Sequence, residues 1–573
     1  MAEPQSMNAL LQAAAAHFER NELDEADALC SQILTDTSSA DASHLRGLIA
    51  VSRGDYVGAA DYLTAAVAQA PEDAAMHLRL AGVLLALEDR ERAPGVAEKA
   101  VSLNPDDREA HLYLAQARLL QKRFDDANAS ALRALAMAPE WPRALEILAL
   151  IAVEGGKRER AMQLAERALA GNAQRAVAHR VIADVQVFRR NYDAARQHYD
   201  AALSIEPKNG KILSNYATLL SRAGEPELAT EAFQKSLRYL PRNSAAVHGL
   251  ALALLVQGRL SEGWQLYGSR AFVQKGTPRR PELPQLNRLP KPGERVLVWL
   301  DEGVGDQVMW ASVIPDLIQT GADLIVECDR RLIPLFQRAF SQAAFMPRTD
   351  PPTPIPGTSP TAQFSISSDA AAWLRGRFED FPSRSYLAPS PQLAQELRDK
   401  YRRGRSDTPV VGISWKTAAD GKVADEKTLP LTAWGPILHM PGVTFVNLQY
   451  GDSADDVAAA QKRFGISITS DASIDPITDI DAFAAQVAAM DLVITASNAT
   501  AHVAGALGVP TWVLVPKGFG GMWHWFLARD DSPWYPTVRI FRQQTKGDWG
   551  PVIAAASEAF VNFIDTRQSA STS

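Results

Sequence analysis

The chain has few of the features that mark secreted, membrane-spanning or nucleic-acid-binding proteins. Its only cysteines, Cys30 and Cys328, stand in no metal-binding spacing, so we predict neither a disulfide framework nor a zinc site and interpret both as buried thiols. No apolar stretch is long enough to cross a bilayer, and the N-terminus has no signal-peptide pattern, so we expect no membrane span and a cytoplasmic protein. The net charge of −7 is mild for this length and gives no indication of nucleic acid as a ligand.

The composition is that of an ordered, globular protein. Hydrophobic residues make up 46% of the chain and charged residues 22%, which is far from the low hydrophobicity of disordered segments. At 573 residues the chain is longer than a single hydrophobic core usually supports. We therefore expect two or more separately packed units.

Prolines recur with a period of 34 residues along the first half of the chain. They are Pro71, Pro105, Pro139, Pro207 and Pro241, with Ala173 at the position that lacks proline. Small residues follow the same period at three fixed offsets. They are Ala81, Ala93 and Ala100, then Ala115, Ala127 and Ala134, then Ala149, Ala161 and Ala168, then Ala183, Ala195 and Ala202. Two helices are expected to cross closely at these offsets, because only a small side chain fits there.

This pattern resembles the tetratricopeptide repeat, a helix-turn-helix unit of the same period. The resemblance covers about residues 7 to 270, or roughly seven repeats, and predicts an α-solenoid over residues 1–272. We interpret the groove of the solenoid as the binding site for an extended segment of a partner protein. The alternative is a purely architectural spacer.

Eukaryotic O-GlcNAc transferases combine such repeats with a transferase domain and carry a ladder of asparagines along the groove. The residues at the corresponding positions here are Arg79, Tyr113, Ile147, Val181 and Asn215. The missing ladder favours a groove that fits one partner family over a groove that grips any peptide backbone.

A proline-rich linker over residues 273–293 is predicted to end the solenoid, because proline cannot continue a helix. Beyond it, alternating strand and helix signals predict α/β structure. The predicted strands span residues 295–300, 323–328, 409–415, 443–449, 466–468, 491–495 and 511–515. They form two Rossmann-like lobes, 294–391 and 409–567, which a helical connection over 392–408 joins and a disordered tail over 568–573 follows. Such lobes bind ligands at the carboxyl ends of their strands.

Two short motifs stand at predicted strand ends. Gly303-Val304-Gly305-Asp306 precedes a helical pattern over 307–319, and Ser497-Asn498-Ala499-Thr500-Ala501-His502 follows a strand of the second lobe. With Lys427-Thr-Leu-Pro430 and Asp531-Ser-Pro-Trp-Tyr-Pro536, they resemble glycosyltransferases of the bacterial heptosyltransferase type over about residues 294–567. The resemblance implies the GT-B fold, an inverting and metal-independent reaction, and a nucleotide sugar as co-substrate with no further cofactor.

The resemblance implies that Asp306 is the general base, which accepts the proton of the acceptor hydroxyl during the transfer. Gly303 and Gly305 form a glycine turn that we expect to be open to a ligand. The alternative interpretation is that Asp306 caps a helix beginning at Gln307, a common role for aspartate.

Basic residues of the second lobe are assigned to the donor. Lys416 and Lys427 match family positions that face the leaving nucleotide phosphate, where a cation stabilises the developing charge. Each could instead be a solvated loop charge. Gln449 is expected to bound the base or sugar of the donor.

The donor-binding set continues in the loop after a second-lobe strand. Ser497 and Asn498 replace an Asp-Thr pair of the family, and both can hydrogen-bond a phosphate or sugar. Thr500 and His502 lie in the first turns of the helix predicted to start at Asn498, where free amides and the helix dipole favour an anion. His502 is expected to face the donor phosphate, and the alternative is a histidine satisfied within the helix packing.

The string Asp479-Ile480-Asp481 looks like the metal-binding DxD motif of another transferase fold. It opens a predicted helix over 482–490, where acidic residues are common. We therefore interpret it as a helix cap and predict no metal ligand.

The order of the two parts indicates a protein acceptor, because a saccharide-modifying enzyme has no use for a peptide-binding solenoid. The leading hypothesis is a protein O-glycosyltransferase that captures a polypeptide and transfers a sugar to serine or threonine. This layout resembles bacterial flagellin glycosyltransferases, which implies flagellin as acceptor and a CMP-linked nonulosonic acid such as pseudaminic acid as donor. The alternatives are an inactive transferase that serves as a scaffold, and a heptosyltransferase-like enzyme acting on a cell-surface saccharide.

Overall fold

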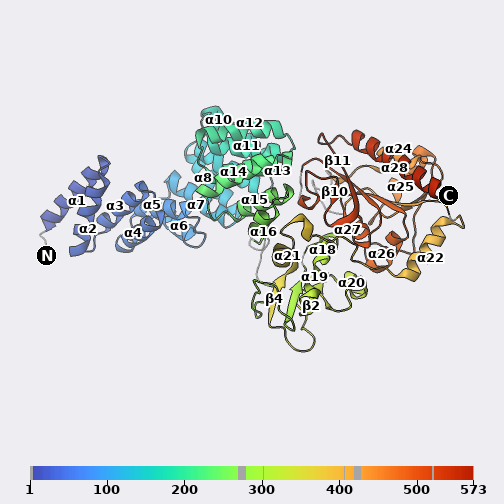
Figure 1. Ribbon diagram of the computed structural model, residues 1–573. Helices are drawn as coiled ribbons and strands as arrows, with labels where there is room; N and C mark the ends of the chain where they lie inside the picture. Colours follow the sequence, from blue (N-terminus) through green and yellow to red (C-terminus); the bar gives the residue numbers. More distant parts are fainter. Residues whose placement is uncertain are drawn as a thin grey trace. The chain divides into compact units, whose positions relative to one another are not determined.

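The computed structural model describes residues 4–268, 279–300, 302–405, 407–417, 427–518 and 522–571 (Figure 1). The chain divides into two compact units, Met1–Ile212 and Leu213–Ser573. The first unit is helical, whereas the second joins the last repeats to an α/β region. The division falls inside the repeats and ahead of the predicted linker, of which residues 273–278 lie outside the described part of the chain.

Consecutive helices of the first unit pack as hairpins, as the tetratricopeptide pattern predicts. They are α1 (Pro4–Glu19), α2 (Leu23–Asp36), α3 (Ala40–Ser52), α4 (Tyr56–Gln69), α5 (Ala74–Ala86), α6 (Arg92–Leu103), α7 (Arg108–Leu120), α8 (Phe124–Met137), α9 (Pro142–Glu154), α10 (Arg158–Gly171), α11 (Ala176–Phe188) and α12 (Tyr192–Ile205). Helix α13 (Gly210–Ala223) spans the boundary between the units.

The periodic small residues occupy the positions predicted for them. All twelve alanines, from Ala81 to Ala202, are at most 1% exposed, because they lie where helices cross. Each periodic proline follows a helix end; Pro71, for example, comes two residues after the last residue of α4. A third periodic position caps helices: Asp73 and Asp107 accept hydrogen bonds from backbone amides at the starts of α5 and α7. The tetratricopeptide prediction is confirmed.

The five residues compared with an asparagine ladder do not all face a groove. Arg79 is exposed and Tyr113 and Asn215 are half-buried, but Ile147 and Val181 are buried among the helices of neighbouring repeats. The side chains of Ile147 and Val181 lie in the core because the burial of an apolar side chain is favourable. These two residues therefore cannot shape a groove surface, which corrects the expectation for them.

The second unit begins with the last repeats, and aromatic side chains connect these to the α/β region. Its helices here are α13, α14 (Pro226–Tyr239), α15 (Ser244–Val256) and α16 (Leu260–Tyr267). On α16, the Trp264 indole donates to the carbonyl of Arg375 at 2.8 Å. The ring of Trp264 meets Trp523 and Trp310 edge-on, with centroids 5.4 and 6.1 Å apart, and Trp310 meets Trp534 at 5.5 Å. We call Trp264, Trp310, Trp523 and Trp534 the tryptophan cluster.

The first sheet of the α/β region has four parallel strands in the order β3-β2-β1-β4. They are β1 (Arg295–Trp299), β2 (Asp323–Cys328), β3 (Ala344–Pro347) and β4 (Ala362–Ser365). The end of the linker lies beside β4, because the backbone of Gln363 bonds to Pro284 and Leu286. The strand order reverses between β1 and β4, and ligands of doubly wound sheets bind at such a reversal.

The second sheet has seven strands in the order β10-β11-β9-β8-β5-β6-β7, all parallel except β10. They are β5 (Val410–Ser414), β6 (Thr444–Asn447), β7 (Ile468–Thr469), β8 (Leu492–Ala496), β9 (Thr511–Val515), β10 (Asp531–Ser532) and β11 (Tyr535–Arg542). Apart from β10, this is the doubly wound order 3-2-1-4-5-6, whose reversal lies between β5 and β8.

Helices of the α/β region connect and cover the strands. They are α18 (Val304–Trp310), α19 (Ile314–Gln319), α20 (Ile333–Ala339), α21 (Ala371–Leu374), α22 (Pro391–Arg402), α24 (Gly435–Leu438), α25 (Ala454–Phe464), α26 (Ile480–Ala488), α27 (Ala499–Leu507) and α28 (Gly550–Ser571). Helix α22 lies in the predicted connection. The expected disordered tail, 568–573, is helical as far as Ser571, because α28 continues into it.

Three smaller predictions can be read directly from the structure. Cys30 and Cys328 are buried and free, and burial raises their pKa values to about 11 and about 12. Asp479 caps α26 by accepting from the amide of Ala482 at 2.9 Å, and Asp481 pairs with Arg338 of α20. Within the described ranges, no helix has the length and apolar character needed to cross a membrane.

Replacing Trp264 by alanine tests whether the last repeat belongs to the same packed unit as the two sheets. The change removes an indole that is 3% exposed and leaves a cavity beside Trp310 and Trp523, so the free energy of unfolding should fall by about 3–5 kcal/mol. Denaturant titration of the full chain measures it. The control is Leu228→Ala on α14, whose side chain is 46% exposed. Equal stability of the two variants would contradict a shared core.

Candidate functional site

A cavity of about 460 Å³ opens where the carboxyl ends of strands from both sheets meet. The turn after β1 contributes Gly303 to Asp306, and Thr417 follows β5. The loop after β8 contributes Ser497 and Asn498. The cavity therefore lies at the strand-order reversals of both sheets, where doubly wound folds bind ligands. We call it the central cavity.

Asp306 lies in the first turn of α18 and lines the central cavity. The helix begins at Val304 and its N-cap is Gly303, so Asp306 is not the cap of a helix starting at Gln307 as the alternative interpretation held. The helix starts earlier than predicted because Glu302 takes a positive φ of 74°, which turns the chain sharply after β1. The carboxylate stands where amide dipoles of the first turn favour negative charge.

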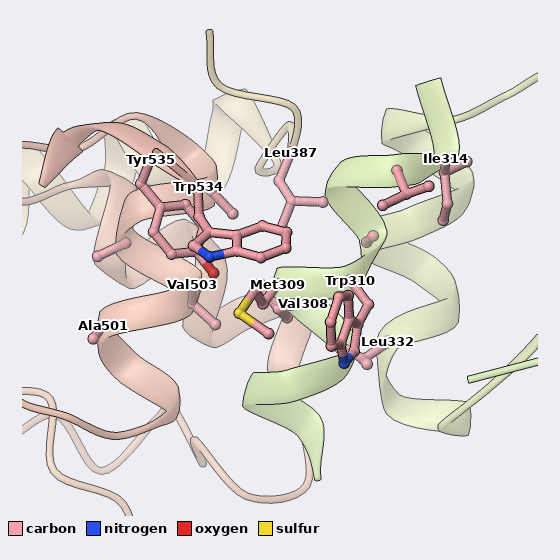
Figure 2. Packing of buried hydrophobic residues seen from close by; sticks show 14 of the residues in the cluster. Val308, Met309, Trp310, Ile314, Leu332, Leu387, Ala501, Val503, Trp534 and Tyr535 are labelled. Carbon is pink, nitrogen blue, oxygen red and sulfur yellow. The ribbon is translucent and has the colours of Figure 1, made fainter. Parts of the chain in front are cut away.

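Gly305 lets the two sheets' helices approach each other. A Cβ atom at this position would lie 3.1 Å from both the Cα of Ala499 and the Cδ2 of His502, on α27. Backbone cannot move aside as a flexible side chain can. The glycine turn is therefore a packing contact between α18 and α27 as well as part of the cavity wall. Figure 2 shows Val308 and Met309 of α18 beside Val503 of α27.

Asn498 caps α27 and fastens its start to the end of β5. Its Oδ1 accepts from the amide of Thr500 at 3.0 Å, and its Nδ2 donates to Ser414 Oγ at 2.8 Å and to the carbonyl of Lys416 at 3.0 Å. Ser497 Oγ accepts from the Trp525 indole at 2.8 Å. Both predicted donor-binding residues line the cavity, but their buried side chains also hold its wall in place.

Three other predicted donor-binding residues do not line the central cavity. Lys416 pairs with Asp456 of α25 at 2.7 Å. Gln449 is buried, and its Oε1 accepts from Ser414 Oγ and from the backbone amides of the next two residues, Trp415 and Lys416. Thr500 is buried, with its hydroxyl 3.4 Å from the carbonyl of Leu448. Burial and internal hydrogen bonds make Gln449 and Thr500 parts of the framework.

Two histidines form one wall of the cavity, and burial keeps them neutral. His502 Nδ1 lies 2.8 Å from the Tyr535 hydroxyl, and its ring stacks on Trp525 at 5.4 Å. Burial and the nearby charge of Lys427 lower the pKa of His502 to about 3. Burial, His502 and Lys427 hold the pKa of His524 well below its usual value. His502 therefore faces the cavity as a neutral ring, and Lys427 also lines it.

His524 and the residues that hold it are not among the site residues that the sequence predicts. His524 lies in a short 3-10 helix, Trp523–Trp525, beyond β9, and its Nε2 is buried with no hydrogen-bond partner among the described residues. Arg542 of β11 donates to the carbonyls of Trp525 and Phe526 and so fixes this segment. The run Trp523-His-Trp525 after a strand is the sequence feature that could have indicated this part of the site. It belongs to no repeated motif.

The described residues contain no cluster of three or more histidine, cysteine, aspartate or glutamate side chains arranged to hold a metal ion.

The fold and the site define the class of protein. The chain is a tetratricopeptide-repeat protein whose C-terminal region contains two parallel sheets with a cavity at their carboxyl ends. Tetratricopeptide repeat families match residues 50–94, 78–143, 180–237 and 216–271. Such repeats generally bind proteins or peptides.

One relative shows the family. The chain is 31% identical to Protein FlbA of Caulobacter vibrioides over 435 residues, which cover 73% of this chain and 72% of that protein. The chain belongs to the FlbA family. The matched length is too great to lie within the repeats or the α/β region alone, so the alignment with this relative includes residues of both parts.

Solved structures match parts of the chain. One is a thermophilic tetratricopeptide protein of Thermus thermophilus, with 25% identity, a TM-score of 0.30 and coverage of 32% of this chain and 100% of that chain. Another is a tetratricopeptide repeat protein from Parabacteroides merdae, with 18% identity, a TM-score of 0.32 and coverage of 40% of this chain and 91% of that chain.

The buried histidines predict a loss of stability in weak acid. In the unfolded chain both titrate near pH 6.5, so below that pH the unfolded state binds protons that the folded state does not, and the free energy of unfolding falls. For His502 the loss continues down to about pH 3. We expect the free energy of unfolding to depend less steeply on pH in His524→Gln. Between pH 6 and 5, its slope against pH should be smaller than that of wild type by about 1.4 kcal/mol per pH unit. Leu228→Ala removes no titrating group and should keep the wild-type slope; an unchanged slope in His524→Gln would contradict the neutral histidine.

Proposed function

We propose that the chain is a protein O-glycosyltransferase whose α/β region is a GT-B catalytic domain. A sugar passes from a nucleotide donor, with inversion and without a metal, to a serine or threonine of a polypeptide held by the repeats. The new bond joins the hydroxyl oxygen to the anomeric carbon, the bond from that carbon to the phosphate oxygen breaks, and the hydroxyl proton goes to Asp306.

The observation that carries the proposal is the composition of the central cavity. Asp306 comes from the strand-order reversal of the first sheet, while Lys427 and the start of α27 come from the second. A transfer of this kind needs a base beside the acceptor and positive charge beside the leaving phosphate. The neutral His502 and His524 add polar groups without further charge.

For the acceptor we infer flagellin, and for the donor a CMP-linked nonulosonic acid such as pseudaminic acid. Both follow from the resemblance of the repeat-plus-transferase layout to flagellin glycosyltransferases. A tetratricopeptide solenoid is suited to holding an extended polypeptide. The packing of the last repeat on the tryptophan cluster gives the solenoid a fixed end beside the catalytic region.

One observation favours the alternative of a binding scaffold without activity. The side chains of Ser497 and Asn498 already bond to Trp525, Ser414 and the backbone, so they offer few free donors to a nucleotide sugar. In the glycosyltransferase proposal, the donor phosphate is instead bound by Lys427 and by the amides at the start of α27.

Asp306→Asn tests the base. The amide keeps the size of the side chain but cannot accept the proton, so transfer should slow by at least about 100-fold while the fold is retained. The assay incubates the full chain with lysate of a strain that lacks it, which supplies acceptor and donor, and follows the protein masses. Asp455→Asn, an exposed change in the first turn of α25, is the matched control. Modification at the wild-type rate by Asp306→Asn would remove the base assignment, and no modification by wild type would favour the scaffold.

Removing residues 1–209 tests the protein acceptor. The truncation keeps α13 to α16 and the tryptophan cluster, whereas a cut at residue 270 would remove Trp264 and expose Trp310. We expect the truncated chain to lose protein modification but to retain the binding of nucleotide sugar, measured by calorimetry with donor isolated from the same lysate. Undiminished modification would point instead to a saccharide acceptor.

A further inference from the structure

A second cavity, of about 550 Å³, adjoins the central cavity at the first sheet. The two share Arg331 and Ile477 in their walls. Arginines are the main feature of the second cavity: Arg330 and Arg331 follow β2, and Arg348 follows β3. It therefore lies at the carboxyl edge of the first sheet, beside the turn that carries Asp306. We call it the arginine cavity.

Hydrogen bonds fix the floor of the arginine cavity. Gln307 Oε1 accepts from the amide of Asp329 at 2.8 Å, and its Nε2 donates to the carbonyl of Glu302 at 3.1 Å. Arg331 holds the Asp329 carboxylate with two nitrogens and donates to the carbonyl of Ile477 at 2.8 Å. The Arg331 guanidinium lowers the pKa of Asp329, which stays ionised. Arg331 and Asp329 thus neutralise each other.

The other two arginines have no carboxylate partner among the described residues. Arg348 donates from Nη1 to the carbonyl of Leu300 at 2.7 Å, which anchors one edge of the guanidinium. Within the described part of the chain, neither Arg348 nor Arg330 forms an ion pair, and Arg330 has no side-chain hydrogen bond. Besides Asp329, Glu302 is the one acidic residue in the described lining, where Arg330 and Arg348 supply two cations. The cavity therefore carries positive charge that the described lining residues do not neutralise.

We propose that Arg330 and Arg348 bind a carboxylate of the substrate whose reacting group occupies the central cavity. A guanidinium presents parallel N–H groups that match the two oxygens of a carboxylate. In the proposed function, Lys427 and the start of α27 bind the donor phosphate on the side of the second sheet. The cations on the side of the first sheet therefore bind a different anionic group. The carboxylate belongs either to the transferred sugar or to an acidic residue next to the acceptor hydroxyl.

This inference rests on the proposed function, and a complementation experiment separates the two. A strain without its own copy of the chain is complemented with wild type, with Arg330→Ala/Arg348→Ala, with Arg330→Lys/Arg348→Lys, or with Arg405→Ala. Arg405 is exposed and lies outside both cavities, so its variant controls for the loss of a surface arginine. Site-resolved mass spectrometry gives the mass of the sugar and the rate of modification at each site, and thermal unfolding confirms that each variant is folded.

The double alanine variant should modify its sites at a rate reduced roughly tenfold or more, since hydrogen bonds to charged groups are lost. The lysine variant should recover part of the rate, and Arg405→Ala should match wild type. An acidic sugar with equal losses at every site assigns the carboxylate to the donor. A neutral sugar with losses confined to sites beside Asp or Glu assigns it to the acceptor.

The opposite results are equally definite. Wild-type modification by the double alanine variant, or a neutral sugar with losses that ignore neighbouring acidic residues, would overturn the carboxylate site while leaving the transferase intact. A wild-type strain whose proteins carry no sugar would overturn the proposed function, and the inference with it.

Discussion

The close contact of α18 with α27 at Gly305 is the constraint on which the site depends. It brings the turn after β1 against the loop after β8, so that the strand-order reversals of two separate sheets share one cavity. A Cβ atom at this position would lie 3.1 Å from the backbone Cα of Ala499, so the two helices would have to shift by a few tenths of an ångström. The residue therefore serves the packing of α18 on α27, beside Asp306 in the wall of the central cavity.

Helix α18 also joins this contact to the repeats. Its first turn carries Asp306, and its last residue, Trp310, packs against Trp264 of the last repeat. Trp310 also packs against Trp534 of the second sheet region, and Figure 2 shows these two side chains. Helix α18 has only seven residues, so Asp306 and Trp310 lie about one turn apart on the same short helix. The tryptophan cluster thus positions the candidate base as well as holding the last repeat, and a boundary drawn at the linker would divide one packed core.

The repeats and several strands could be predicted from the sequence. The hydrogen-bond and ion-pair partners of single side chains could not. The period of the prolines and alanines found the repeats because each unit obeys the same packing rule, and apolar runs located strands such as β2 and β9 at their bounds. The chemistry of single residues depends on partners distant in sequence. Lys416 matched a phosphate-binding position, but Asp456 pairs with it, and Gln449 braces the end of β5. His524 could not be predicted from the sequence, because it reaches His502 only in the folded chain. There Arg542 holds its segment in place.

The charges around the two cavities are divided in a way that suits a ligand with two anionic groups. The histidine wall is neutral because burial of His502 and His524 makes protonation costly. Since Asp329 neutralises Arg331, the cationic character of the central cavity comes from Lys427. Lys427 lies on the side of the second sheet, while Arg330 and Arg348 lie on the side of the first, with the turn of Asp306 adjoining both. A base surrounded by cations on one side only would have its carboxylate drawn toward them. In the proposed transfer, cations on two sides, each paired with its own anion when substrate is bound, would leave Asp306 as the acceptor for the proton of the hydroxyl.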